Sequence, residues 1–98
     1  MNDPKLAAQK FEELARLAGL ADTEFEKAAV YAAAEALAAR FREVESEFSA
    51  YALEKVESAR WSIAAAVGYD VTNGHGREQH VGWAYAAAST LQNVIDSR

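Results

Sequence analysis

The two histidines of the chain stand close together in the sequence, where they could act as metal ligands. His75 and His80 flank Glu78 in the segment HGREQH. Imidazole nitrogens and carboxylate oxygens are donors that bind zinc and related divalent ions. Positions five apart do not share one face of a helix, however, and only Asp70 adds another acidic ligand nearby. We therefore predict no metal site and no cofactor; the ligands to test first would be His75, Glu78 and His80.

Acidic side chains in the middle of the chain form a second candidate site. In a continuous helix Glu43 and Glu47 lie on one face, and Glu54 follows two turns after Glu47. A di-iron site would need Glu-x-x-His pairs, which the sequence lacks. We predict that a negative stripe binds a basic surface of a protein partner, and the alternative is a solvated helix face. The predicted partner-binding residues are Glu43, Glu47, Glu54 and Glu57.

Nucleophilic catalysis has no support in the pattern of serines and histidines. All the serines fall in or beside expected helices, and none stands in the strand-turn-helix context of a nucleophile elbow. We predict that the protein is not an enzyme.

Helices must position these side chains, because capping residues and apolar periodicity recur along the whole chain. Asp3 is a suitable N-cap, and Gly19 and Gly68 are suitable helix ends. Thr23 and Glu26 match a capping box at the start of the second helix. The expected helices cover residues 4–18, 23–67 and 77–96, with a loop at 68–76.

The second of these segments is too long for a compact chain of 98 residues, since its residues 24–67, which are 44 residues without glycine or proline, would make a helix of about 66 Å. Its apolar stripe changes register near Ser46 and Ser49, from one beginning at Val30 to one beginning at Ala52. Either the helix bends near residues 46–50, or it stays continuous and pairs in a homodimer. Of the two arrangements, the homodimer is the one that we expect.

The last helix supports the same expectation, because no formal charge occurs between Glu78 and Asp96. Beside its main apolar stripe runs a second one that contains Trp83, Ala87 and Thr90. Such a helix is the centre of a bundle or a contact surface between copies. The predicted self-association residues are Trp83, Ala87, Leu91 and Val94.

Composition narrows the class of protein further. Fifteen acids against ten bases give a net charge of −5, which disfavours direct binding to nucleic acid or to anionic lipid. No cysteine is present, and no segment is apolar and long enough to cross a membrane, so we expect a cytoplasmic protein. The fold class is predicted as all-α: an antiparallel bundle of three to four helices with one very long or kinked central helix.

The profile of a small, acidic, cysteine-free chain is similar to that of phage-encoded inhibitors such as anti-CRISPR proteins. The similarity is one of composition and implies an inhibitor or adaptor that binds a larger nucleic-acid-handling protein. The alternative is a small-molecule or metal-ion binder that uses the loop and helix start at residues 68–80.

Overall fold

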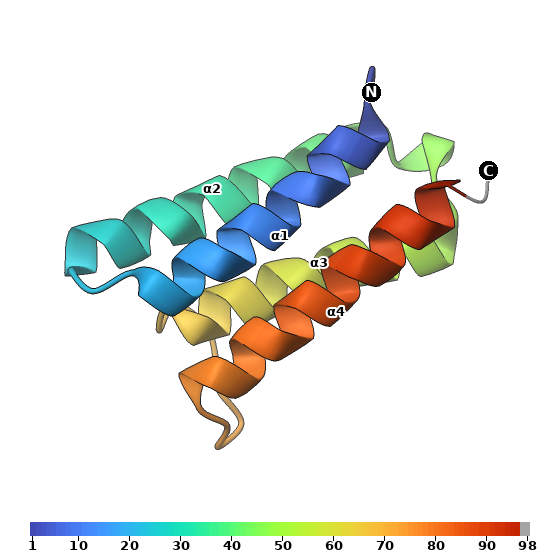
Figure 1. Ribbon diagram of the computed structural model, residues 1–98. Coiled ribbons are helices and arrows are strands. Elements are labelled where there is room, and N and C mark those ends of the chain that lie inside the picture. The colour runs from blue at the N-terminus through green and yellow to red at the C-terminus, as the bar shows by residue number, and fades with distance from the viewer. Residues whose placement is uncertain (97–98) are drawn as a thin grey trace.

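The computed structural model describes residues 1–96 and is an all-α bundle in which successive helices run in opposite directions (Figure 1). The main elements are α1 (Pro4–Leu20), α2 (Glu24–Glu43), α3 (Ala50–Ala66) and α4 (Arg77–Asp96). Each helix packs on the next, and α1 also packs on α4, which closes the bundle. The packing between α3 and α4 is the most extensive. The molecule measures 37 × 22 × 18 Å, with a Cα radius of gyration of 12.6 Å.

Residues 23–67 do not form one continuous helix, so the arrangement that the sequence favoured is wrong and its alternative, a bend near residues 46–50, is the one found. A short 3-10 helix, η1 (Glu45–Glu47), separates α2 from α3. The backbone leaves helical geometry on both sides of it, at Val44 (φ −122°, ψ 35°) and at Phe48 (φ −125°, ψ 151°). Ser49 then starts α3 as its N-cap, since its hydroxyl accepts a hydrogen bond of 3.1 Å from the amide of Ala52.

Burial within one chain explains why the segment folds back. From the first expected stripe, Val30, Ala34, Leu37 and Phe41 are buried. From the second, Ala52, Val56, Ala59, Ile63 and Ala66 are buried. The half-buried Phe48 lies at the turn between them, with its ring centroid 5.2 Å from that of Phe41. The change of register therefore marks the point where each stripe turns to face the same core.

The first helix is longer than expected, because Gly19 does not end it. α1 continues through Gly19 to Leu20. A Cβ added at Gly19 would lie 3.7 Å from Val81 Cγ2 of α4, an ordinary contact distance, so the packing of α1 on α4 does not require glycine here. The end of α1 is capped from a distance by Arg77, which donates hydrogen bonds to the carbonyls of Ala18 (2.7 Å) and Ala21.

The end of α3 has the Schellman geometry expected at Gly68. Gly68 has a φ of +87°, its amide bonds the carbonyl of Ala65 at 3.2 Å, and the amide of Tyr69 bonds the carbonyl of Ala64 at 2.9 Å. The side chain of Tyr69 stacks on Tyr31 of α2, with 4.6 Å between ring centroids. The loop from residue 67 to residue 76 then leads into α4.

Among the helices of residues 1–96, none combines the length and apolar character that a bilayer span requires.

Candidate binding site between α3 and α4

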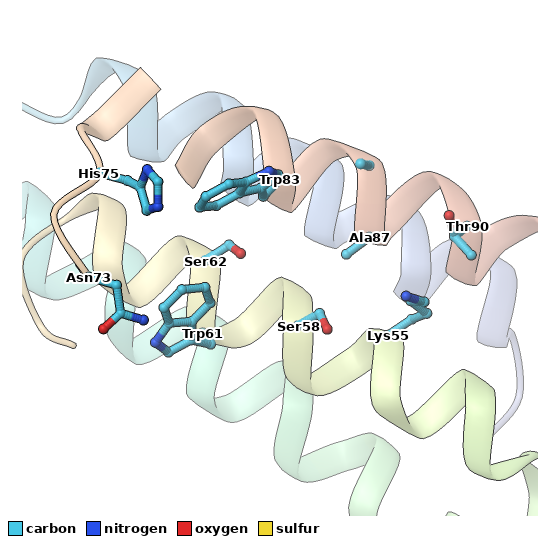
Figure 2. Close-up of a pocket in the computed structure, with 10 residues that line it drawn as sticks. Lys55, Ser58, Trp61, Ser62, Asn73, His75, Trp83, Ala87 and Thr90 are labelled. Atoms are coloured by element: carbon cyan, nitrogen blue, oxygen red, sulfur yellow. The ribbon is translucent and has the colours of Figure 1, made fainter. Parts of the chain in front are cut away.

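A cavity of about 470 Å³ runs along the outer side of the contact between α3 and α4 (Figure 2). The loop that precedes α4 closes one end of this groove. Both tryptophans of the chain line it. The lining residues are Lys55, Ser58, Trp61, Ser62, Asn73, His75, Trp83, Ala86, Ala87 and Thr90.

The two indoles lie on opposite walls near the loop. Trp61 projects from α3 and is half-buried, whereas Trp83 projects from α4 and is 37 % exposed. The His75 ring packs edge-on against Trp83, with 4.8 Å between centroids. The loop end of the groove is therefore its aromatic end.

A tight turn carries His75 into this position. The amide of His75 bonds the carbonyl of Thr72 at 3.1 Å, and the two residues between them have positive φ: 54° at Asn73 and 82° at Gly74. Positive φ at both central positions is the type I′ turn, for which Asn-Gly is a preferred sequence.

His80 is fully buried and contacts three of the lining rings. Its centroid lies 5.1 Å from Trp61, 5.3 Å from Trp83 and 6.1 Å from His75. His80 Nε2 lies 2.9 Å from the carbonyl oxygen of Thr72 and must donate there, because a carbonyl only accepts. Within residues 1–96, Nδ1 of His80 has no hydrogen-bond partner. His80 therefore ties the loop to the tryptophan walls.

The opposite end of the groove is polar. Lys55 and Ser58 come from α3 and Thr90 from α4. The Lys55 ammonium lies 5.0 Å from the ring centroid of Tyr51, a cation–π contact. Among the described residues that line the cavity, Lys55 is the one with a formal charge.

The histidines named as possible metal ligands therefore take other roles. His75 packs on Trp83, the Nε2 atom of His80 is held by Thr72, and Glu78 is exposed. In the described part of the chain, no three histidine, aspartate or glutamate side chains gather in a way that could hold a metal ion.

The four predicted partner-binding glutamates do not share one helix face, which corrects the expected stripe. The break after α2 places Glu43 at its end, Glu47 in η1, and Glu54 and Glu57 in α3. Glu47 accepts a hydrogen bond of 3.2 Å from the Met1 ammonium. Glu43 and Glu54 are exposed and have no ion-pair partner among residues 1–96.

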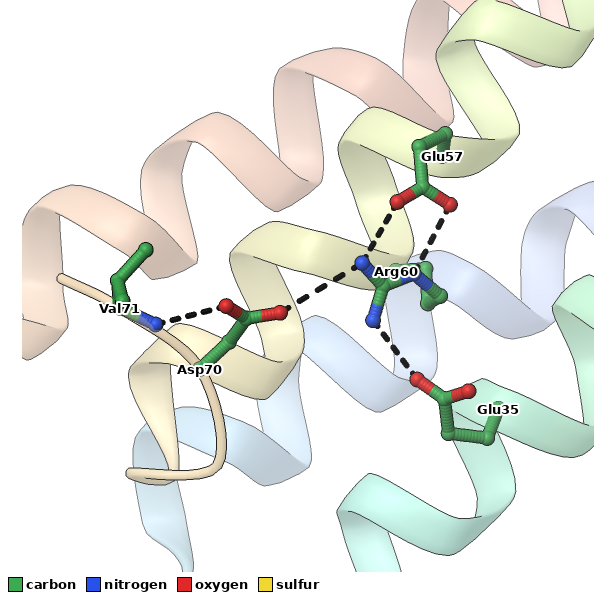
Figure 3. Close-up of polar contacts among 5 residues, drawn as sticks. All are labelled: Glu35, Glu57, Arg60, Asp70 and Val71. Atoms are coloured by element: carbon green, nitrogen blue, oxygen red, sulfur yellow. Dashed lines mark hydrogen bonds and ion pairs between the residues drawn. The ribbon is translucent and has the colours of Figure 1, made fainter.

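Glu57 belongs to a network around Arg60 (Figure 3). The Arg60 guanidinium donates to Glu57 at 2.6 and 2.9 Å and to Glu35 of α2 at 2.7 Å. Its third carboxylate partner, Asp70, lies 3.6 Å away in the loop. The hydrogen bond with Glu57 is the main cause that raises the pKa of Arg60 above its usual value, and burial opposes it in part. The network joins α2, α3 and the loop.

The four predicted self-association residues divide into two pairs. Leu91 is fully buried and Ala87 is 8 % exposed, so their own chain already covers both. Trp83 is partly exposed and Val94 half-buried, and self-association through these two stays a prediction.

The sequence did not predict the groove, although it did predict the helix stripe that forms one of its two walls. The second stripe of the last helix contains Trp83, Ala87 and Thr90, and all three line the cavity. The other wall is formed by Lys55, Ser58 and Trp61, which recur every three residues along α3. Joining the two stripes requires knowing that α3 and α4 are neighbours.

Known proteins offer no guide to this site: no family model matches the chain, and neither does any curated protein sequence or solved structure.

Proposed function

We propose that this protein is a non-enzymatic small-molecule-binding protein and that the groove between α3 and α4 is its binding site. The observation that carries the proposal is the cavity of about 470 Å³ lined by both tryptophans. Ligand sites are concavities of about 300–1,000 Å³ that combine apolar and aromatic walls with placed polar groups. This cavity combines two indoles and two alanines with six polar side chains.

Binding without catalysis fits the chemistry of the lining. A serine nucleophile requires a hydrogen-bonded base, and no hydrogen bond joins Ser58 or Ser62 to a histidine in the described part of the chain. His80 holds the loop through Nε2, and its whole ring, including Nδ1, is buried beneath the lining rings, so it is not exposed to a substrate in the groove.

Tryptophan fluorescence is a direct test, because both tryptophans lie in the groove. We expect members of a chemically varied fragment library to change the emission saturably, and each such fragment to raise the melting temperature. The groove-filling variant Ala86→Leu should abolish these responses, since Ala86 is an exposed lining residue at which leucine keeps good helix propensity.

Ala36→Leu is the matched control, because it places the same side chain on an exposed position of α2. It should leave every fragment response unchanged. A library without one saturable binder, or binders that respond equally in Ala86→Leu and in the parent protein, would contradict the proposal.

Binding of a larger protein is a second candidate function, supported by the carboxylates around the turn from α2 to α3. Glu43, Glu45 and Glu54 are exposed there and lack ion-pair partners within residues 1–96. The partner would be a nucleic-acid-handling protein with a basic surface, and this protein would act as its inhibitor or adaptor.

Charge reversal tests this second function. In a pull-down from the natural source with washes of rising salt, the variant Glu43→Lys/Glu54→Lys should lose a basic protein that the parent retains. The control Asp22→Lys/Glu78→Lys makes the same charge change at the other end of the bundle and should retain it. Equal recovery with both variants would exclude this surface.

A further inference from the structure

We infer that the groove selects small organic anions with a flat apolar body, the body lying against the indoles and the anionic group on Lys55. The inference rests on the proposed function and names its ligand class. It follows from the separation of two chemistries along one cavity, an aromatic end and a cationic end (Figure 2).

The distance between the ends sets the length of the ligand. Lys55 and Trp61 are six residues apart on α3, which is about 9 Å along the helix axis. On α4, Trp83 and Thr90 are seven residues apart, or about 10 Å. Since the helices are antiparallel, the two indoles share one end and Lys55 faces the end with Thr90. A ring joined to an acid by a chain of several bonds matches this spacing.

The charge of Lys55 is available to a ligand. Two other lysines are paired, Lys5 with Asp96 at 3.1 Å and Lys27 with Glu24 at 3.6 Å. Lys55 has no carboxylate partner among residues 1–96, and its ammonium rests on the Tyr51 ring. Lys55 as a residue is half-buried, and an ammonium without a counter-ion attracts an anion and disfavours a cation.

Hydroxyl groups complete the cationic end. Ser58 lies one turn from Lys55 on α3, and Thr90 lies on the opposite wall. Both hydroxyls can donate to carboxylate or phosphate oxygens, so that three donors surround the anionic group.

An aromatic pocket can instead recognise a quaternary ammonium group through cation–π contacts. Lys55 argues against that class, because the same cavity would then hold two positive charges. The two classes make opposite predictions for one set of related probes.

The experiment titrates tryptophan fluorescence with 6-phenylhexanoate, its neutral amide, 6-phenylhexyl-trimethylammonium and hexanoate. We expect 6-phenylhexanoate to bind about tenfold more tightly than the amide, because a charged hydrogen-bond partner contributes more than a neutral one. The ammonium probe should bind more weakly than the amide. Hexanoate, which has no ring, should give no saturable signal.

Three variants test whether Lys55 causes the tighter binding of the anion. Lys55→Met should lower the affinity for 6-phenylhexanoate to that for the amide, and the affinity for the amide itself should not change. Lys55→Arg should keep the tighter binding of 6-phenylhexanoate over the amide. Lys10→Met removes an exposed charge from α1 and should change nothing. Circular dichroism confirms that each variant is folded.

Each result decides the inference. Equal or tighter binding of the amide or the ammonium probe overturns the anion class and leaves the groove as a binding site. A preference that survives in Lys55→Met also overturns it. If no phenyl probe binds, the anion class falls, whereas the proposed function falls only with failure of the wider fragment screen.

Discussion

His80 connects three parts of the molecule through one imidazole ring. It packs on Trp61 of α3 and on Trp83 of its own helix, and its Nε2 atom donates to Thr72 in the loop. Because the ring is fully buried, its loss removes packing as well as a hydrogen bond. The residue that looked in the sequence like a possible metal ligand thus shapes the aromatic end of the groove.

We expect His80→Ala to lower the free energy of unfolding by about 2–4 kcal/mol, as for other large-to-small changes in a core. His75→Ala is the control, since His75 is exposed and should cost less than about 1 kcal/mol. Urea unfolding followed by circular dichroism measures both. Similar losses in the two variants would show that His80 does not hold the loop.

The capping box of α2 predicts a dependence on pH. Hydrogen bonds from the amides of Thr23 and Asp22 are the main causes that lower the pKa of Glu26. A lowered folded-state pKa gives stability that is complete above the unfolded-state value, about 4.3 for glutamate, and is lost as the pH falls through the folded-state pKa. Between pH 6 and pH 3 the parent protein should therefore lose more stability than Glu26→Gln. Parallel pH profiles of the two proteins would contradict this.

Only part of the binding site could be predicted from individual residues and their local sequence pattern. The sequence places Trp83, Ala87 and Thr90 on one helix stripe, but no local pattern relates them to Trp61, twenty-two positions earlier in the chain. The role of His80 depends on a bond to a loop carbonyl that exists only when the turn at Asn73 and Gly74 has formed. Helix periodicity detects residues of one face, and it does not detect contacts between elements.

The turn between α2 and α3 depends on the N-cap of α3. The Ser49 hydroxyl bonds the amide of Ala52 at 3.1 Å, and such caps contribute about 1 kcal/mol. Ser49→Ala should lower the free energy of unfolding by about that amount, measured in urea. Ser46→Ala changes an exposed serine of η1 and should have an effect near zero. A larger loss of stability in Ser46→Ala than in Ser49→Ala would show that the cap does not stabilise the turn.

Two glycines make opposite predictions because of where they stand in their elements. Gly82 lies inside α4, where an added methyl group would meet no atom within 4 Å, so Gly82→Ala should raise stability by about 1 kcal/mol. Gly68 has a φ of +87°, so Gly68→Ala should lower it by about 1–2 kcal/mol. Thermal and urea unfolding of both variants test the signs. Equal signs would contradict the assigned helix end.

The helix boundaries show which element features were predictable. The Thr23 and Glu26 capping box and the Gly68 end were read correctly because local residues define them. The end of α1 was misplaced, since the helix continues through Gly19 and its end is capped by Arg77, far along the chain. The bend near residue 46 was readable from the register change, but choosing it over a continuous helix required the packing of the whole molecule.

The four helices differ at the scale of the molecule in how much packing each makes. α2 contacts its neighbours least, whereas α3 and α4 share the largest contact. In addition, α2 presents Phe25, which is 82 % exposed, and several exposed alanines to solvent. One of the two arguments for a homodimer no longer applies, because the central segment folds back within the chain. The homodimer stays a prediction.

This difference in packing predicts local stability. Amide hydrogen exchange should be faster in α2 than in the central turns of α3 and α4, because segments with few buried contacts open at lower free energy. Exchange followed by mass spectrometry resolves the helices separately. Equal protection in all four would mean that the bundle opens only as one unit.

The ion pair between Lys5 and Asp96 brings the start of α1 and the end of α4 to the same end of the bundle. The loop that closes the aromatic end of the groove lies at the opposite end. A fusion partner or a surface anchor attached beyond either helix would therefore stand a full helix length away from His75 and the indoles. The protein can be immobilised on a sensor chip through either terminus with the aromatic end of the groove held away from the chip surface.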